Sequence, residues 1–149
     1  MSENVLKLIP IWPHYVPNAA AVRTASNLLA QFFPEAEETA SRLTDKVRFV
    51  DQGENWERVL CPVCGSKLDE NWWQEAVDTA YITGFTDLYV DVPCCGARLS
   101  LNDLEYVWPA GFARFALEIR NPLADLNKEQ LLALEQILGC GIRKVWAHY

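Results

Sequence analysis

Four of the five cysteines in the chain fall into two close pairs, Cys61 with Cys64 and Cys94 with Cys95. Paired cysteines of this kind hold zinc when two tight turns each supply two thiolates to one tetrahedral site. The sequence begins without an export signal, so we expect metal or redox chemistry rather than a disulfide framework. The fifth cysteine, Cys140, lies apart between two glycines at a predicted helix end, where a small structural residue is favoured.

The first pair lies in the segment Cys61-Pro62-Val63-Cys64-Gly65. The glycine can take the positive φ that a tight turn needs, so that both sulfurs point the same way. This CPxCG segment resembles the knuckle of zinc-ribbon proteins over about 8 residues. As a whole, the chain resembles uncharacterised small bacterial proteins that carry such a knuckle inside an α/β domain. The resemblance implies that Cys61 and Cys64 are the first two zinc ligands, and it implies no activity.

The second pair departs from this pattern. When the CGARL sequence that begins at Cys95 is aligned with the CGSKL sequence that begins at Cys64, Val92 falls opposite Cys61. Cys94 can supply the missing thiolate only if the backbone turns sharply, because neighbouring side chains in an extended chain point to opposite sides. We therefore expect Cys61, Cys64, Cys94 and Cys95 to hold a single structural Zn²⁺.

Other groups remain open as the fourth ligand, namely Asp91, His14, His148 or water. A water ligand would leave the open position of a catalytic zinc, whereas an adjacent cysteine closes the site. Two further alternatives are that the cysteines are simply buried small apolar residues, or that they form a redox pair. In thiol–disulfide enzymes the CxxC pair opens a helix, whereas Pro62 and Gly65 are more typical of a knuckle.

The elements that must position these cysteines follow from periodicity and capping residues. Three helices are predicted, after the N-cap residues Asn18, Asp69 and Asn127, and the last has Gln130 to complete a capping box and Gly139 to end it. Alternating or β-rich segments predict strands at 5–11, 44–50, 56–60, 86–92, 114–120 and 142–148. Residues 99–111 are mixed and predict a structured loop or an irregular strand.

Both ends of the chain thus show the order strand, helix, strand. This order predicts an α+β fold with an antiparallel or mixed sheet and three helices, in which ferredoxin-like βαβ units flank a zinc-knuckle segment. We expect one domain over residues 1–149, with the zinc-binding segment at about 56–100, because 149 residues with 50% hydrophobic content suit a single core.

Composition also limits the partners. The formal net charge of −7 argues against nucleic acid, whose binding depends on clustered Lys and Arg. No run of residues reaches the roughly 18 apolar positions of a membrane span, so we expect a soluble, cytoplasmic protein with no membrane partner. The sequence leaves the oligomeric state open.

The remaining residues favour binding over catalysis. The sequence contains no assembled Ser/His/Asp set, no glycine-rich phosphate loop and no HExxH motif, so we predict no catalytic residues. Tryptophan-rich surfaces anchor protein partners, and of the adjacent Trp72 and Trp73 at most one is expected to be fully buried. We expect Trp56, Trp108 and Trp146 to pack around the metal site.

The best hypothesis is therefore a non-catalytic, zinc-stabilised protein-interaction protein, of an adaptor or immunity type, with a protein partner. A metal-dependent hydrolytic enzyme with an open zinc position and a nearby acid such as Asp91 is one alternative. A thiol redox or metal-sensing protein with reactive cysteines is the other.

Overall fold

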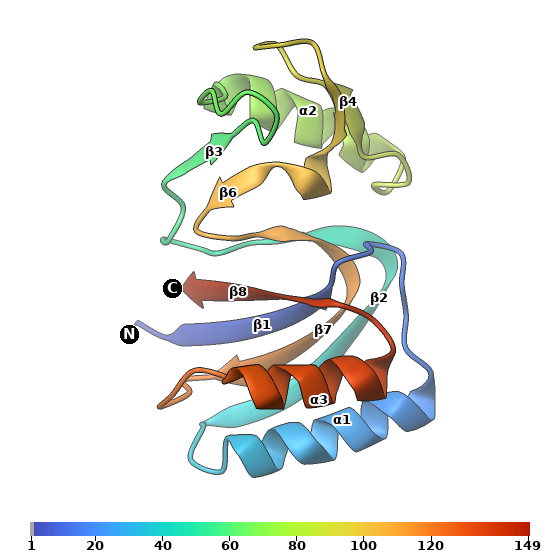
Figure 1. The fold of residues 1–149 in the computed structure, drawn as a ribbon, viewed down its shortest axis with the longest axis vertical. Coiled ribbons are helices and arrows are strands. Elements are labelled where there is room, and N and C mark those ends of the chain that lie inside the picture. Colours follow the sequence, from blue (N-terminus) through green and yellow to red (C-terminus); the bar gives the residue numbers. More distant parts are fainter. Residues whose placement is uncertain (1) are drawn as a thin grey trace.

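A four-stranded antiparallel sheet with two helices on one face forms the larger part of the structure, a computed structural model that describes residues 2–149 (Figure 1). The sheet has the order β2-β7-β1-β8. Its strands are β1 Asn4–Pro10, β2 Glu38–Val50, β7 Gly111–Arg120 and β8 Ile142–His148, and the helices on its face are α1 Ala19–Phe32 and α3 Lys128–Leu138. The two βαβ units and this strand order are those of a ferredoxin-like arrangement. The predicted α+β class with three helices is confirmed.

Successive side chains of the central strands point to opposite faces of the sheet, so each strand contributes to two apolar layers. Leu6 and Leu8 of β1 face α1 and α3 and belong to the core between sheet and helices, whereas Ile9 packs on the opposite face. The helix ends follow the predicted chemistry. Asn18 accepts a hydrogen bond from the N–H of Ala21 at 2.8 Å, and Asn127 forms the capping box with Gln130. Local sequence therefore determines where both helices begin.

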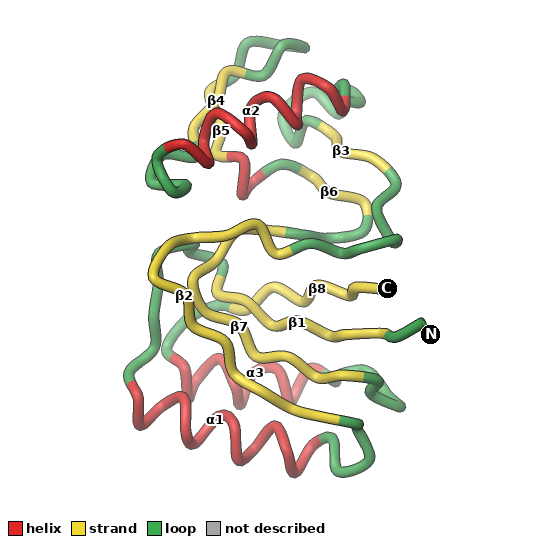
Figure 2. The backbone as a smooth tube through the Cα atoms, turned by 180° about the vertical axis from the view of Figure 1, so that it is seen from behind, coloured by secondary structure: helices red, strands yellow, loops and turns green. Residues whose placement is uncertain are grey.

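Residues 51–110 form an insertion between β2 and β7, drawn at the top of Figure 1 and seen from behind in Figure 2. Strand β3 pairs with β6, and β4 pairs with β5, in two small antiparallel sheets beside one helix. The elements are β3 Arg58–Leu60, α2 Glu70–Ile82, β4 Tyr89–Asp91, β5 Arg98–Ser100, η1 Leu101–Asp103 and β6 Glu105–Val107. The side chain of Asp69 accepts hydrogen bonds from the first turn of α2, as predicted.

Aromatic packing joins the insertion to the four-stranded sheet. The ring of Phe112 on β7 lies 5.1 Å from that of Phe49 on β2 and 5.2 Å from that of Phe85 in the insertion. Phe49 in turn contacts Trp73 of α2 at 5.3 Å between ring centres. Buried Asn102 adds polar links, since its side chain donates to the carbonyl of Ile11 at 3.0 Å and accepts from the N–H of Phe112 at 2.8 Å. The insertion therefore has its own core but shares a boundary layer with the sheet.

Several strand predictions needed correction. Strand β7 begins at Gly111 rather than at residue 114. Strand β2 begins at Glu38 rather than at residue 44, because Glu38–Leu43 pair with β7 although this half is largely exposed and polar, and its register shifts between Leu43 and Arg48. Within 86–92 the apolar alternation is present, but only Tyr89–Asp91 pairs as a strand. The segment 99–111, predicted as a structured loop or an irregular strand, contains most of β5, the 3-10 turn η1 and the short strand β6.

The helices are too short or too polar for a membrane. Among residues 2–149, none has both the length and the apolar character needed to cross a bilayer.

Candidate metal centre

The first cysteine pair lies in a tight turn that starts where β3 ends. The N–H of Gly65 donates to the carbonyl of Cys61 at 2.8 Å, and the N–H of Cys61 donates to the carbonyl of Ser66 at 2.9 Å. Gly65 has a φ of 77°, a conformation that side chains rarely adopt, and no atom would obstruct a Cβ there. The glycine is thus required by backbone conformation and not by lack of space.

The second pair lies in a turn with the same hydrogen bonds. The N–H of Gly96 donates to the carbonyl of Val92 at 2.9 Å, and the N–H of Val92 donates to the carbonyl of Ala97 at 3.0 Å. Gly96 has a φ of 74°. The two turns are therefore equivalent position by position, as the alignment predicts. Cys95 corresponds to Cys64, buried Val92 to buried Cys61, and Cys94 to exposed Val63.

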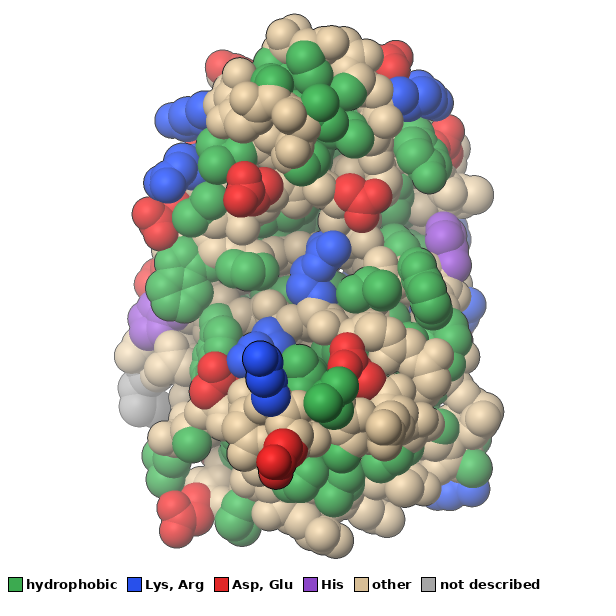
Figure 3. All heavy atoms as spheres, viewed as in Figure 1, with side chains coloured by type: hydrophobic (Ala, Val, Ile, Leu, Met, Phe, Trp, Pro, Cys, Tyr) green, Lys and Arg blue, Asp and Glu red, His purple; other side chains and the backbone are tan. Residues whose placement is uncertain are grey.

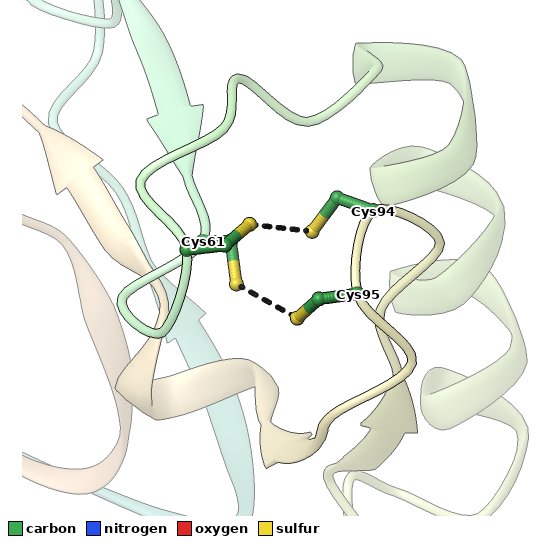
Figure 4. A group of neighbouring side chains, drawn as sticks. Cys61, Cys94 and Cys95 are labelled. Carbon is green, nitrogen blue, oxygen red and sulfur yellow. Dashed lines mark hydrogen bonds between the residues drawn. The ribbon is translucent and has the colours of Figure 1, made fainter.

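The sharp turn at Cys94 brings all four sulfurs together, and they lie within 4.8 Å of one another. Cys61 Sγ is 3.9 Å from Cys95 Sγ, and Cys64 Sγ is 3.4 Å from Cys94 Sγ. Figure 4 shows Cys61 facing Cys94 and Cys95 across the space between the two turns. These separations far exceed the roughly 2.05 Å of a disulfide bond, so all four cysteines are free thiols.

The same separations fit a metal ion. Zn–S bonds of about 2.3 Å in a tetrahedron place neighbouring sulfurs about 3.8 Å apart. The contacts between Cys64 and Cys94, at 3.4 Å, and between Cys61 and Cys95, at 3.9 Å, lie on either side of this value. The four cysteines therefore form a cluster that can hold one metal ion, with two donors from each turn.

The thiols influence one another's ionisation. Hydrogen bonds from the side chain and backbone of Ser66, with a further one from Cys94, lower the pKa of Cys64 to about 6. Desolvation, together with the three neighbouring thiols, raises the pKa of Cys94 to about 12. A divalent metal at this place would offset the negative charge of thiolates that lie so close together.

The other candidate ligands lie outside the cluster. Asp91 pairs with Arg98 at 3.4 Å, and His148 on β8 hydrogen-bonds Asn4 at 2.7 Å. His14 lies on the segment between β1 and α1, and buried Cys140 packs in the core beside the helices. Among residues 2–149, the structure thus brings together the four predicted cysteines, and Asp91, His14 and His148 are not part of the cluster.

The tryptophans differ in how deeply they are buried in the insertion and in what they contact. Trp73 is buried and donates to the hydroxyl of Tyr106 at 3.1 Å, Trp56 packs on Trp73 at 4.8 Å, and Trp72 is only partly buried, as expected. These residues share a core with Cys61. Trp108 is 43% exposed, lies outside this core and donates to Glu57, so, contrary to the prediction, it does not pack with Cys61. The prediction for Trp146 was wrong, because β8 turns its side chain toward the core under the helices.

One contributor to the site was missed. Ser66 Oγ lies 3.2 Å from Cys64 Sγ, two residues after that cysteine. A hydroxyl next to a knuckle cysteine is a recognisable signal, because it stabilises the thiolate.

Comparison with known proteins adds no relative. A scan against protein-family models and searches of curated proteins and of solved structures returned no match to this chain.

Proposed function

We propose that Cys61, Cys64, Cys94 and Cys95 bind one structural Zn²⁺, in the manner of a zinc ribbon with an altered second knuckle. The observation that supports this proposal is the convergence of four sulfurs, two from each of two equivalent turns, at separations close to a tetrahedral edge. Four soft thiolates favour zinc over magnesium or calcium. A reducing compartment such as the cytoplasm keeps these cysteines available for the metal.

A closed four-cysteine site supports a non-catalytic role. Four protein ligands complete the coordination of zinc and leave no position for water or substrate, which a hydrolytic zinc needs. We therefore propose that the protein acts as an adaptor or immunity-type protein that binds a protein partner, with zinc holding the insertion in its binding form. The alternative, a zinc-dependent enzyme, needs an open position. A redox or metal-sensing role needs thiols that oxidise reversibly.

Substitution of the metal by Co²⁺ tests this choice. A cobalt protein with four thiolate ligands should show tetrahedral d–d bands and a strong sulfur-to-cobalt charge-transfer band, both unchanged by excess azide or imidazole. A spectrum that shifts with azide would show an open position and favour the enzyme. Failure to take up any metal, with a disulfide that forms and reduces reversibly, would favour the redox role.

A further inference from the structure

A second feature lies where the insertion meets the segment between β1 and α1. A groove of about 350 Å³ separates this segment from the loop before β4 and from η1. We call it the loop groove, and its lining includes Ile11, Trp12, Asp87, Tyr89, Asn102 and Asp103. The two segments lie at the same edge of the molecule, on the right in Figure 1 and on the left in Figure 2. Figure 3 shows hydrophobic side chains gathered beside a histidine at that edge.

Exposed aromatic rings are unusually prominent in the loop groove. Trp12 is 56% exposed and Tyr89 is 60% exposed, and Ile11 beside them is 40% exposed. Large rings left in water at a concave site commonly mark contact surfaces. One ring already carries a cation, because the guanidinium of Arg98 lies 5.8 Å from the centre of the Tyr89 ring.

The charges in the loop groove are almost all negative. Asp87 and Asp103 line it, and neither forms an ion pair with any other residue of the range 2–149. His14 is the only lining side chain that can become positive. Arg143, whose charge interacts with Asp103, donates instead to the carbonyls of Asn102 at 2.8 Å and Ala110 at 3.0 Å.

One of these carboxylates is held in place. Asp87 Oδ1 accepts a hydrogen bond from the N–H of Tyr89 at 2.9 Å, which fixes the carboxylate beside the exposed ring. An aromatic face next to an ordered carboxylate suits a planar guanidinium, which stacks on the ring and donates to the oxygens. The long aliphatic stem of an arginine can then lie along Trp12 and Ile11.

We propose that the loop groove binds an arginine side chain of a basic segment on the protein partner. This inference rests on the proposed binding role and names the chemistry of its partner. Carboxylates repel a nucleic-acid backbone, and a purely apolar partner would bury the Asp87 carboxylate without an ion-pair partner, which is costly. A cationic side chain satisfies both the charge and the rings.

An NMR titration of the zinc-loaded protein tests the groove. The probe is N-acetyl-arginine methylamide, and the neutral control is the nearly isosteric N-acetyl-citrulline methylamide. Arginine should shift backbone amides around Trp12, Asp87, Tyr89 and Asp103 with a millimolar Kd, and citrulline should bind at least about tenfold more weakly.

Variants separate the groove from the general acidity of the protein. Asp87→Asn with Asp103→Asn should weaken arginine binding at least about fivefold, since the amide at position 87 keeps an acceptor for the N–H of Tyr89 but loses the charge. Glu35→Gln with Glu129→Gln removes the same charge from two exposed acids elsewhere, and it should leave binding within about twofold of wild type.

Several results would overturn the proposal. These are equal binding of citrulline, shifts scattered over the acidic surface, equal losses in both double variants, or groove shifts that follow protein dilution and so indicate a second copy. The zinc content of the same samples is measured in parallel. A zinc-loaded protein that ignores arginine would refute only the loop groove, whereas a protein that binds arginine without metal would refute only the zinc role.

Discussion

Cys61 and Cys140 are both buried thiols, with 0% and 6% of their surface exposed, but their surroundings differ completely. Cys61 begins a turn and faces three other sulfurs, whereas Cys140 packs among leucines and phenylalanines under the helices, where burial raises its pKa to about 11. Residue type and burial alone do not distinguish these two roles. The distinction comes from the other cysteines that the fold brings near each of them.

This difference predicts unequal effects of the same substitution. Cys61→Ser should remove a ligand, reduce bound zinc from one per chain to nearly none after brief chelation, and destabilise the protein by about 3–5 kcal/mol. Cys140→Ser should keep the zinc and cost about 1 kcal/mol through a buried hydroxyl. Metal content by mass spectrometry and denaturant unfolding measure both. Full metal content in the Cys61 variant would show that Cys61 is not a ligand.

At the scale of elements, the sequence predicts the conformation of the two turns but not how the turns face each other. The alignment of Cys64-Gly65 with Cys95-Gly96 predicts their equivalence correctly, because glycine at positive φ and its hydrogen bonds define the turn. The first cysteine of each turn lies at a different place, since Cys61 is at the first position of its turn and Cys94 is at the third position of its turn. Spacing alone does not show that a position-three thiol reaches the same point, because this depends on how the two turns face each other.

Because the turns are equivalent, moving the cysteine from position 94 to position 92 should preserve the metal site. Cys94→Val should lose tight zinc binding, and adding Val92→Cys should restore it, because position 92 corresponds to Cys61 in the first turn. Competition with a chromophoric zinc chelator measures both affinities. A double variant that binds zinc no better than Cys94→Val alone would show that the turns present their first positions differently.

Capping residues and clear alternation made the other elements predictable. The capping box at Asn127 and the αL glycine at Gly139 set both ends of α3, and the last strand, 142–148, was predicted to the residue. The length of strand β2 was underestimated. Its first half, Glu38 to Leu43, is mostly exposed, and its side chains show no apolar alternation. Pairing with β7 extends it to Glu38, and that long-range pairing has no local signature.

For the molecule as a whole, the ferredoxin-like unit and the insertion rely on different interactions. The unit packs its sheet on α1 and α3 around large aliphatic side chains, whereas the insertion has three-residue strands and one helix around a core rich in aromatic rings. Sheets of two short strands are marginal by themselves, so a cross-link between Cys61–Cys64 and Cys94–Cys95 is the kind of support they need. Loss of the metal should therefore destabilise the insertion more than the four-stranded sheet.

Hydrogen exchange after chelation tests this division. Removal of zinc should speed exchange of amides in β3, α2, β4 and β5 at least about tenfold, while amides of β1, β7 and β8 change by less than about twofold. Uniform loss of protection across both parts would mean that the insertion and the sheet unfold together and that the metal supports the whole domain.

We propose above all that four cysteine sulfurs from two equivalent turns surround one zinc ion. X-ray absorption at the zinc edge of the purified, metal-loaded protein measures this most directly. A site of four thiolates predicts a single shell of four sulfurs at about 2.3 Å with no nitrogen or oxygen ligand. A shell that mixes sulfur with nitrogen or oxygen, or a protein that retains no zinc at all, would contradict it.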